Sequence, residues 1–130
     1  MRHPERVEDY LEHIAQASER AIAYVQPFGG VEALRHNQQV QDAVIRNIEI
    51  IGEAATRIEK HAPAFVTAHP ELPWIEMRGM RNKMIHNYFE VSLTVVWNTL
   101  KDDLPQLKKQ IDDLLVDYRR GRRGEHEHSQ

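Results

Sequence analysis

The stretch Asn37–Lys60, NQQVQDAVIRNIEIIGEAATRIEK, decides the fold of this chain. Its apolar residues recur at steps of three or four, which is the period of one helix face. They are Val40, Val44, Ile48, Ile51, Ala55 and Ile58. The spacing predicts a long helix over 37–60 that buries one side. Gly52 lies inside it, where glycine costs about 1 kcal/mol relative to alanine. It indicates either close approach by a neighbouring element or simple drift.

The same period predicts a helix over residues 4–26, with Pro4 in its first turn. Its apolar stripe is Val7, Leu11, Ile14, Ala17, Ala21 and Val25. The segment Pro27–Gly30 ends this helix, and a short helical turn is expected over 31–35. The stretch 61–73 contains three prolines and is predicted to be a loop with one helical turn around 64–68.

A third long helix is predicted over 74–89, and a fourth begins near Ser92, which suits an N-cap. Residues 91–97 are rich in β-branched side chains and could form a strand. A lone strand would have no partner, so the helical interpretation is preferred. Pro105 either kinks this last helix or starts a new one. Trp74, Trp97, Tyr88 and Phe89 are expected in the core rather than on a binding platform.

These elements predict an all-α protein, an antiparallel bundle of four main helices plus short helical turns. Residues 1–118 form its single domain, and residues 119–130 form a basic tail that is expected to be disordered. No run of 18 or more apolar residues is present, so no membrane association is expected. The absence of cysteine excludes a disulfide scaffold and fits a cytoplasmic protein.

The formal net charge of −3 argues against a general polyanion binder, so any nucleic-acid contact must use a local basic patch. Arg78, Arg81 and Lys83 form one such patch. The other is the tail, with Arg119, Arg120, Arg122 and Arg123. Terminal charge runs of this kind more often serve only to keep a chain end solvated.

Metal and cofactor sites are not expected. A di-iron bundle needs Glu-x-x-His pairs, and no such pair occurs. His-Glu-x-x-His is also missing, and Gly29-Gly30 lacks the lysine of a phosphate-binding loop. The remaining constellation is Arg81-x4-His86-x-Tyr88.

This constellation has the groups that metal-independent RNA cleavage requires. Histidine serves as acid or base near neutral pH, and here His86 could act on the 2′-OH or the leaving oxygen. The planar guanidinium of Arg81 matches phosphate oxygens, and Asn82 adds a neutral donor. The alternative is an ordinary solvated helix surface with a half-buried histidine.

Helix geometry complicates a site within one chain, because Arg81 and His86 lie about 140° apart on an ideal helix. Arg81 could lie in an irregular first turn after Gly79, its side chain could reach around the helix, or a second molecule could complete the site. One histidine supplies the acid or the base but not both. A two-fold homodimer would bring two copies of His86 to one phosphate, so we expect a homodimer with the site in its groove.

The segment Met80–Phe89, MRNKMIHNYF, resembles the signature of HepT-like toxins of the HEPN superfamily. Asn47–Ala55 resembles that family's second-helix pattern, and Val96-Trp97 with Asp102–Pro105 resembles the start of its last helix. The resemblance covers residues 4–116 in the same order. It implies a HEPN-like helical homodimer that cleaves RNA.

The resemblance also implies residue roles. Arg81 and His86 would be catalytic with Asn82 as a polar helper, without a cofactor. A minimal nucleotidyltransferase would be the antitoxin partner and would add AMP to Tyr88, where a bulky anion would block an RNA phosphate. Glu53 would be a positioning residue that orients Arg81. A surface ion pair between Glu53 and Arg57 is an equal alternative.

Arg78 and Lys83 are further candidates for RNA contacts, because they flank the catalytic pair with positive charge. The leading hypothesis is therefore an endoribonuclease toxin of a toxin–antitoxin pair. A non-catalytic HEPN module that docks the nucleotidyltransferase or binds a nucleotide is the main alternative. A helical scaffold without any ligand is the third, and it leaves the cluster of Arg81, Asn82 and His86 unexplained.

Overall fold

The computed structural model describes residues 7–86 and 93–128, with side chains for 7–80 and 93–121. All regular elements in these ranges are helical. They are α1 (Val7–Val25), α2 (Val31–Arg35), α3 (Gln38–His61), α4 (Pro63–Ala68), α5 (Trp74–His86), α6 (Leu93–Asn98) and α7 (Leu104–His128), with a π-helical segment Thr99–Asp103 between α6 and α7. The predicted all-α class and helical bundle are confirmed, and so are both short helical turns.

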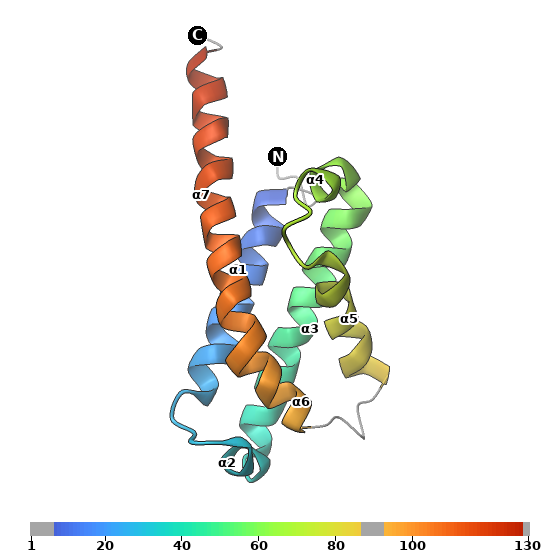
Figure 1. Cartoon of the computed structure of the whole chain (residues 1–130), viewed down its shortest axis with the longest axis vertical. Helices are drawn as coiled ribbons and strands as arrows, with labels where there is room; N and C mark the ends of the chain where they lie inside the picture. The colour runs from blue at the N-terminus through green and yellow to red at the C-terminus, as the bar shows by residue number, and fades with distance from the viewer. Residues whose placement is uncertain (1–6, 87–92, 129–130) are drawn as a thin grey trace.

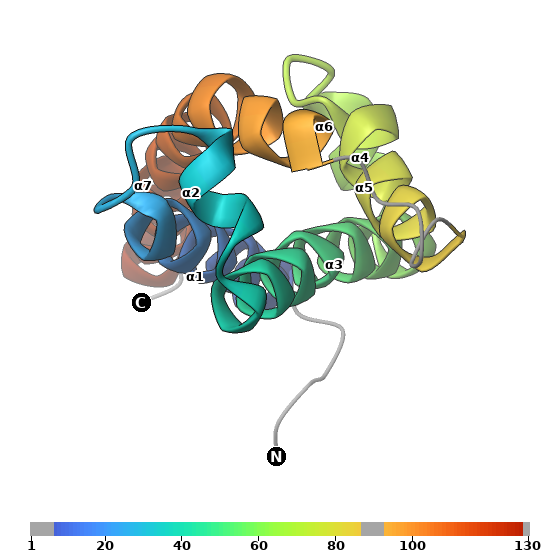
Figure 2. The ribbon, with the colours of Figure 1, turned by 90° about the horizontal axis from the view of Figure 1, so that it is seen from below.

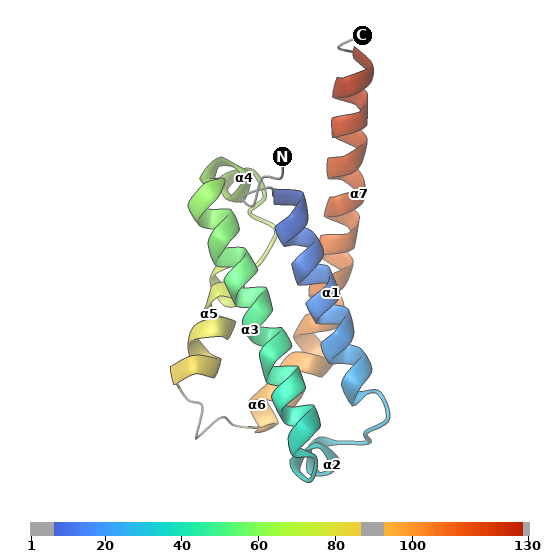
Figure 3. The same cartoon turned by 180° about the vertical axis from the view of Figure 1, so that it is seen from behind.

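The central element is α3, which packs against α1 on one side and α5 on the other, while α1 also packs against α7. Neighbouring helices run in opposite directions: α1 and α5 descend in Figure 1, and α3 and α7 ascend. Seen from behind, α1 and α3 lie side by side along the bundle (Figure 3). The end-on view in Figure 2 shows α6 and α7 opposite α3. Each helix thus turns one face toward a shared interior.

The apolar stripes predicted from periodicity form this interior. On α3, the residues Val44, Ile48, Ile51, Ala55 and Ile58 are all buried, and on α1 Leu11, Ile14, Ala17, Ala21 and Val25 are. The two outermost positions of these stripes, Val7 and Val40, are only half-buried and pack against the core edge. Burial of such side chains removes apolar surface from water, which is the main force that holds the helices together.

The sequence sets the ends of α3 by local interactions. The side chain of Asn37 accepts a hydrogen bond from the backbone N–H of Val40 at 3.1 Å, which satisfies a donor that the first turn leaves open. At the other end the chain turns at Ala62, and Pro63 begins α4 because a first-turn proline loses no helical hydrogen bond. The direction of α3 is therefore fixed at both ends.

Pro105 is the second residue of α7, which agrees with the expectation that this proline lies at the start of a new helix. A proline inside an α-helix clashes with the carbonyl four residues earlier and lacks the N–H that would bond it. Here the preceding turn is widened into the π-helical segment Thr99–Asp103, and the N–H of Leu104 reaches the carbonyl of Thr99. This wider turn makes room for the proline ring in the first turn of α7.

The last helix extends beyond the expected domain end at Tyr118. A disordered tail was predicted for residues 119–130, but α7 continues to His128. The part of α7 after Tyr118 is anchored at its beginning by Arg119. The guanidinium of Arg119 lies 2.7 Å from Glu8 and 2.5 Å from Glu12 of α1. The hydrogen bond to Glu8 raises the pKa of Arg119. An ion pair between residues so far apart in sequence is invisible to periodicity.

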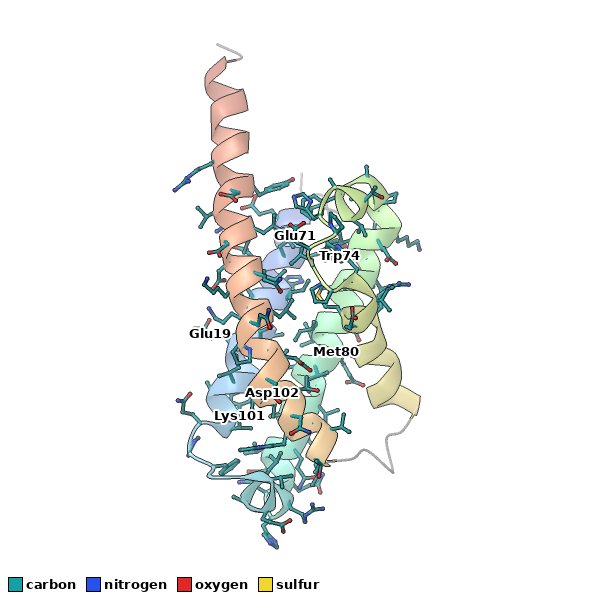
Figure 4. The ribbon with its side chains drawn as sticks, viewed as in Figure 1. Glu19, Glu71, Trp74, Met80, Lys101 and Asp102 are labelled. Atoms are coloured by element: carbon teal, nitrogen blue, oxygen red, sulfur yellow. The ribbon has the colours of Figure 1, made fainter. Side chains whose placement is uncertain are left out.

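Two methionines of α5 provide a matched test of how this helix is held. Met77 is fully buried, whereas Met80 is half-buried on the side of α5 that faces α7 (Figure 4). We predict that Met77→Ala lowers the free energy of unfolding by about 2–5 kcal/mol, the range for a truncated core side chain. Met80→Ala should cost less than half as much. Urea denaturation of both variants measures this, and equal losses would contradict the docking of α5 through Met77.

Candidate active site

The residues predicted to be catalytic share one helix. Arg81, Asn82, Lys83 and His86 all fall within α5, which runs without interruption from Trp74 to His86. Their backbone is described, but their side chains, like all of Tyr88 and Ser92, lie outside the described residues. The helix assignment nevertheless fixes the relative direction in which these positions leave the axis. That constraint decides which arrangements of the site are open.

The continuous helix rules out an irregular first turn at Arg81. Residue 81 lies seven positions after Trp74 and four after Met77. It therefore falls on the same stripe of α5 as these two buried residues. His86 continues a different stripe, with Ile75, Gly79 and Asn82. The two stripes are about 140° apart, and residues 81 and 86 are separated by about 7.5 Å along the axis. These two positions do not share a face.

The height of the site along the bundle follows from the contact between α3 and α5. The Nε of Arg78 lies 3.2 Å from a carboxylate oxygen of Glu59, which makes these residues level with one another. Antiparallel helices with the same rise then bring residue 86 level with about residue 51 or 52 of α3. Gly52 is buried there, on the same side of α3 as Glu59. Gly52 therefore lies at about the height of the predicted site residues, and its close approach to a neighbouring element stays a prediction.

Arg78 is therefore engaged in an ion pair rather than free to bind RNA alone. Its side chain is 41% exposed and that of Glu59 is 29% exposed. The Nε atom is also enclosed by protein, and its approach to Glu59 is too poorly aligned to count as a hydrogen bond. A pair of this exposure contributes between about 0 and 1 kcal/mol, so Arg78 can still exchange partners at little cost.

Glu53 does not form the expected pair with Arg57. Its carboxylate lies 3.3 Å from Arg46, two turns earlier on α3, and Arg46 also lies 3.7 Å from Glu49. Glu53 lines a depression between α1 and α3, together with Tyr10 and His13. The i−7 partner is reached because the arginine side chain lies along the helix surface. Sequence spacing had favoured Arg57 because the i,i+4 distance is shorter.

Sequence reasoning missed an exposed apolar residue on the stripe that leads to His86. Ile75 is 72% exposed although it follows the buried Trp74 directly. It lines a depression with Val66, Pro70 and Pro73 at the junction of α4 and α5. The signal was present, because Ile75 is offset by one residue from the stripe of Trp74 and Met77. One exposed apolar side chain is ordinary, but Ile75 adjoins Val66, Pro70 and Pro73, and together they offer an apolar surface to a partner.

The loop before α5 is held rigidly, so the start of the site helix is well defined. The indole N–H of Trp74 donates to the carbonyl of His69 at 2.9 Å, and His69 stacks on Phe65 with ring centroids 4.2 Å apart. Phe65 also makes edge contacts with Trp74 and with Tyr118 of α7. Figure 4 shows Trp74 beneath this loop, near Glu71.

Among the described residues, no group of three or more histidine, cysteine, aspartate or glutamate side chains is placed to hold a metal ion. Within the same residues, no helix is both long enough and apolar enough to cross a membrane.

Comparison with known proteins identifies the family. Residues 9–114 match the model of the family described as Ribonuclease HepT-like. The chain belongs to this family. A *Thermococcus cleftensis* protein provisionally named ribonuclease HepT is 43% identical over 106 residues, which are 82% of this chain and 93% of that protein. A *Caldanaerobacter subterraneus* subsp. *tengcongensis* protein provisionally named an RNase is 37% identical over 106 residues, 82% of this chain and 91% of its own length.

A further HepT-like relative, from *Methanocaldococcus jannaschii* and also provisionally named an RNase, is 34% identical over 82% of this chain and 94% of its own length. No solved structure gives a significant match to the chain. The matched residues 9–114 include all of α5, so the candidate site belongs to the part of the chain that the family shares. The end of α7 does not.

Proposed function

We propose that this HepT-like protein is a metal-independent RNA endonuclease and the toxin of a toxin–antitoxin pair that acts in the cytoplasm. The observation that carries the proposal is the position of Arg81, Asn82 and His86 on one helix of a chain that belongs to a family of ribonucleases. The groups on this helix are those that cleavage by 2′-OH attack needs. A base, an acid and a cation to stabilise the charged phosphorus intermediate are sufficient.

In the proposed reaction, a neutral His86 removes the proton of the 2′-OH, and the 2′-oxygen attacks the adjacent phosphorus. The bond from phosphorus to the 5′-oxygen breaks, and a protonated histidine gives that oxygen its proton. The products are a 2′,3′-cyclic phosphate and a 5′-OH end. Arg81 stabilises the negative charge that grows on the phosphate oxygens, and Asn82 donates a hydrogen bond to it.

This reaction needs two histidines in opposite protonation states, and each chain offers His86 alone on the site helix. The separation of positions 81 and 86 by about 140° adds a second reason for a composite site. A two-fold homodimer with α5 at its axis would supply both histidines and both arginines to one groove. Ile75, on the same stripe as His86, supplies exposed apolar surface for that contact.

Arg78 and Lys83 extend the positive charge around the catalytic pair and would hold neighbouring phosphates. For Arg78 this requires an exchange of Glu59 for a phosphate. Glu53 would act as a positioning residue for Arg81. Because Glu53 lies toward α1 and is paired with Arg46, it would have to release Arg46 to do so.

We predict that the wild-type protein cleaves RNA in the presence of EDTA and leaves 2′,3′-cyclic phosphate ends. His86→Ala and Arg81→Ala should each lower the rate by about a hundred-fold to ten-thousand-fold, because each removes a group that acts in the transition state. Gel analysis of labelled RNA with end-group identification measures both. Equal cleavage by the alanine variants, or strict dependence on a divalent metal, would refute the mechanism. Wild-type binding of RNA without cleavage would favour the non-catalytic module.

The same assay tests Glu53 against a matched control. Glu49 and Glu53 both pair with Arg46, so Glu49→Gln and Glu53→Gln remove equivalent surface charge. If Glu53 positions Arg81, only Glu53→Gln lowers the cleavage rate, and it does so without a change in KM. An equal effect of the two substitutions would assign Glu53 a surface ion pair and nothing more.

We predict that Ile75→Asp disrupts the homodimer and abolishes cleavage. A charged group in the apolar part of the contact would raise the dimer dissociation constant by about 30-fold or more, the effect of a residue that carries at least 2 kcal/mol. Val116→Asp is the control, since Val116 is 49% exposed but lies on α7. Light scattering during size-exclusion chromatography gives the oligomeric state. An Ile75→Asp variant that stays dimeric would exclude this face, and a fully active monomer would exclude the composite site.

The proposed antitoxin is a minimal nucleotidyltransferase that transfers AMP to Tyr88. In that step the phenol oxygen attacks the α-phosphorus of ATP, and pyrophosphate leaves. A phosphate ester two residues from His86 would repel an RNA phosphate and occupy its space. We predict that co-expression with the cognate enzyme adds one or more adenylyl groups, seen by intact mass and mapped by peptide sequencing. Tyr88→Phe should stay unmodified and toxic, and AMP on any other residue would contradict the assignment.

A further inference from the structure

The end of α7 has a composition unlike the rest of the helix. Upstream, α7 buries Leu107, Ile111 and Leu115 in the core. From residue 119 to 128 the helix reads RRGRRGEHEH and contains no apolar side chain. A helix without an apolar stripe has nothing to bury against the bundle. In Figures 1 and 3 this part of α7 projects past the ends of its neighbours.

The base of this projection is anchored. Arg119 is held between Glu8 and Glu12 of α1, and the side chain of Glu8 is only 11% exposed. The anchor fixes the direction in which α7 leaves the bundle. It also uses the charge of Arg119, so Arg120, Arg122 and Arg123 are the remaining cations of this segment. Arg120 is exposed.

The usual structural reasons for arginine and glycine do not explain this segment. Cations stabilise a helix when they lie in its last turn, but the last turn of α7 carries Glu125 and Glu127 instead, and the arginines precede it. Gly121 lowers helix stability, and a methyl group in its place would meet nothing within 4 Å. Neither packing nor a close approach requires it. The three remaining arginines occur within four residues of a chain with a net charge of −3.

We propose that the projecting end of α7, with Arg120, Arg122 and Arg123, is an arm that binds the phosphate backbone of RNA away from the cleavage site. This inference rests on the proposed ribonuclease function. Positions 120, 122 and 123 leave the axis of α7 in different directions, so the three arginines are not confined to one face of the helix. Such a distribution suits a flexible single strand that wraps around a charged helix, and it reads no bases.

The geometry also predicts which RNA benefits. The helix α5 runs from the α4 end of the bundle toward the α6 end and finishes at His86, whereas α7 projects beyond the opposite end (Figure 1). A short oligonucleotide held at His86 therefore cannot reach the arm of the same chain. A long RNA can occupy both. The arm should raise the affinity for long substrates and leave cleavage of the shortest ones unchanged.

The test uses the full-length protein with His86→Ala, so that RNA is bound but not cut. Arg120→Gln, Arg122→Gln and Arg123→Gln are combined in one variant. The control combines Lys60→Gln, Lys101→Gln and Lys109→Gln, which removes three exposed charges from the body of the bundle. Fluorescence anisotropy gives the dissociation constant for a long single-stranded RNA and for a trinucleotide over a range of KCl concentrations. Circular dichroism checks that both variants keep their helices.

We expect the arm variant to bind long RNA about ten-fold more weakly or worse, with the slope of log K against log salt reduced by about 2, because three phosphate contacts are lost. Trinucleotide binding should not change, and the control variant should resemble the parent. Equal affinity for long RNA, or an equal loss in the control variant, would overturn the proposal. So would binding of anionic lipid vesicles by the arm with unchanged RNA affinity.

A charge-neutral substitution adds a second test. Gly121→Ala favours the helical state of the arm and should tighten binding of long RNA by about two- to five-fold. Weaker binding would overturn a helical arm. The outcomes also separate RNA binding by the arm from the proposed ribonuclease function. If the wild-type protein cleaves RNA but the arm variant binds long RNA normally, only the proposal about the arm is refuted. If the wild-type protein cuts no RNA but binds it through the arm, only the ribonuclease function is refuted.

Discussion

The continuous hydrogen-bonded helix α5 is the constraint on which the account of this protein depends. It places residue 81 on the stripe that begins with Trp74 and Met77, and it directs residue 86 about 140° away. Burial of Trp74 and Met77 in the core holds this helix in the bundle. No rotation of α5 about its axis brings both positions to one face, because the helix itself fixes the angle between them. The proposed completion of the site by a second chain would remove that conflict.

The charge distribution favours RNA contacts by a few localised cations. A chain with a net charge of −3 does not attract RNA by its overall field, so its affinity has to come from a few placed cations. Some of these are already engaged in the described structure: Arg78 with Glu59, and Arg119 with Glu8 and Glu12. The proposed RNA contacts use other cations, on the site helix and at the end of α7.

Periodicity predicted the stripes of α1 and α3 almost residue by residue, because burial of one helix face repeats every three or four residues. It did not predict the π-helical turn before Pro105, which depends on how the chain makes room for a proline ring. Nor did it find the pairing of Glu53 with Arg46, or the anchor of Arg119. These contacts depend on side-chain direction and on helices that meet only after folding. Ile75 differs from these cases, because its offset from the stripe of Trp74 and Met77 already indicated an exposed position.

The central claim is that the catalytic unit is the dimer, with both copies of His86 acting on one phosphate. An isolated heterodimer of one wild-type subunit and one His86→Ala subunit, purified through two different tags, tests it most directly. The account predicts that its cleavage rate falls to that of the His86→Ala homodimer, because the acid or the base is missing from the shared site. A heterodimer with half of the wild-type rate would contradict it, since each chain would then carry a complete site.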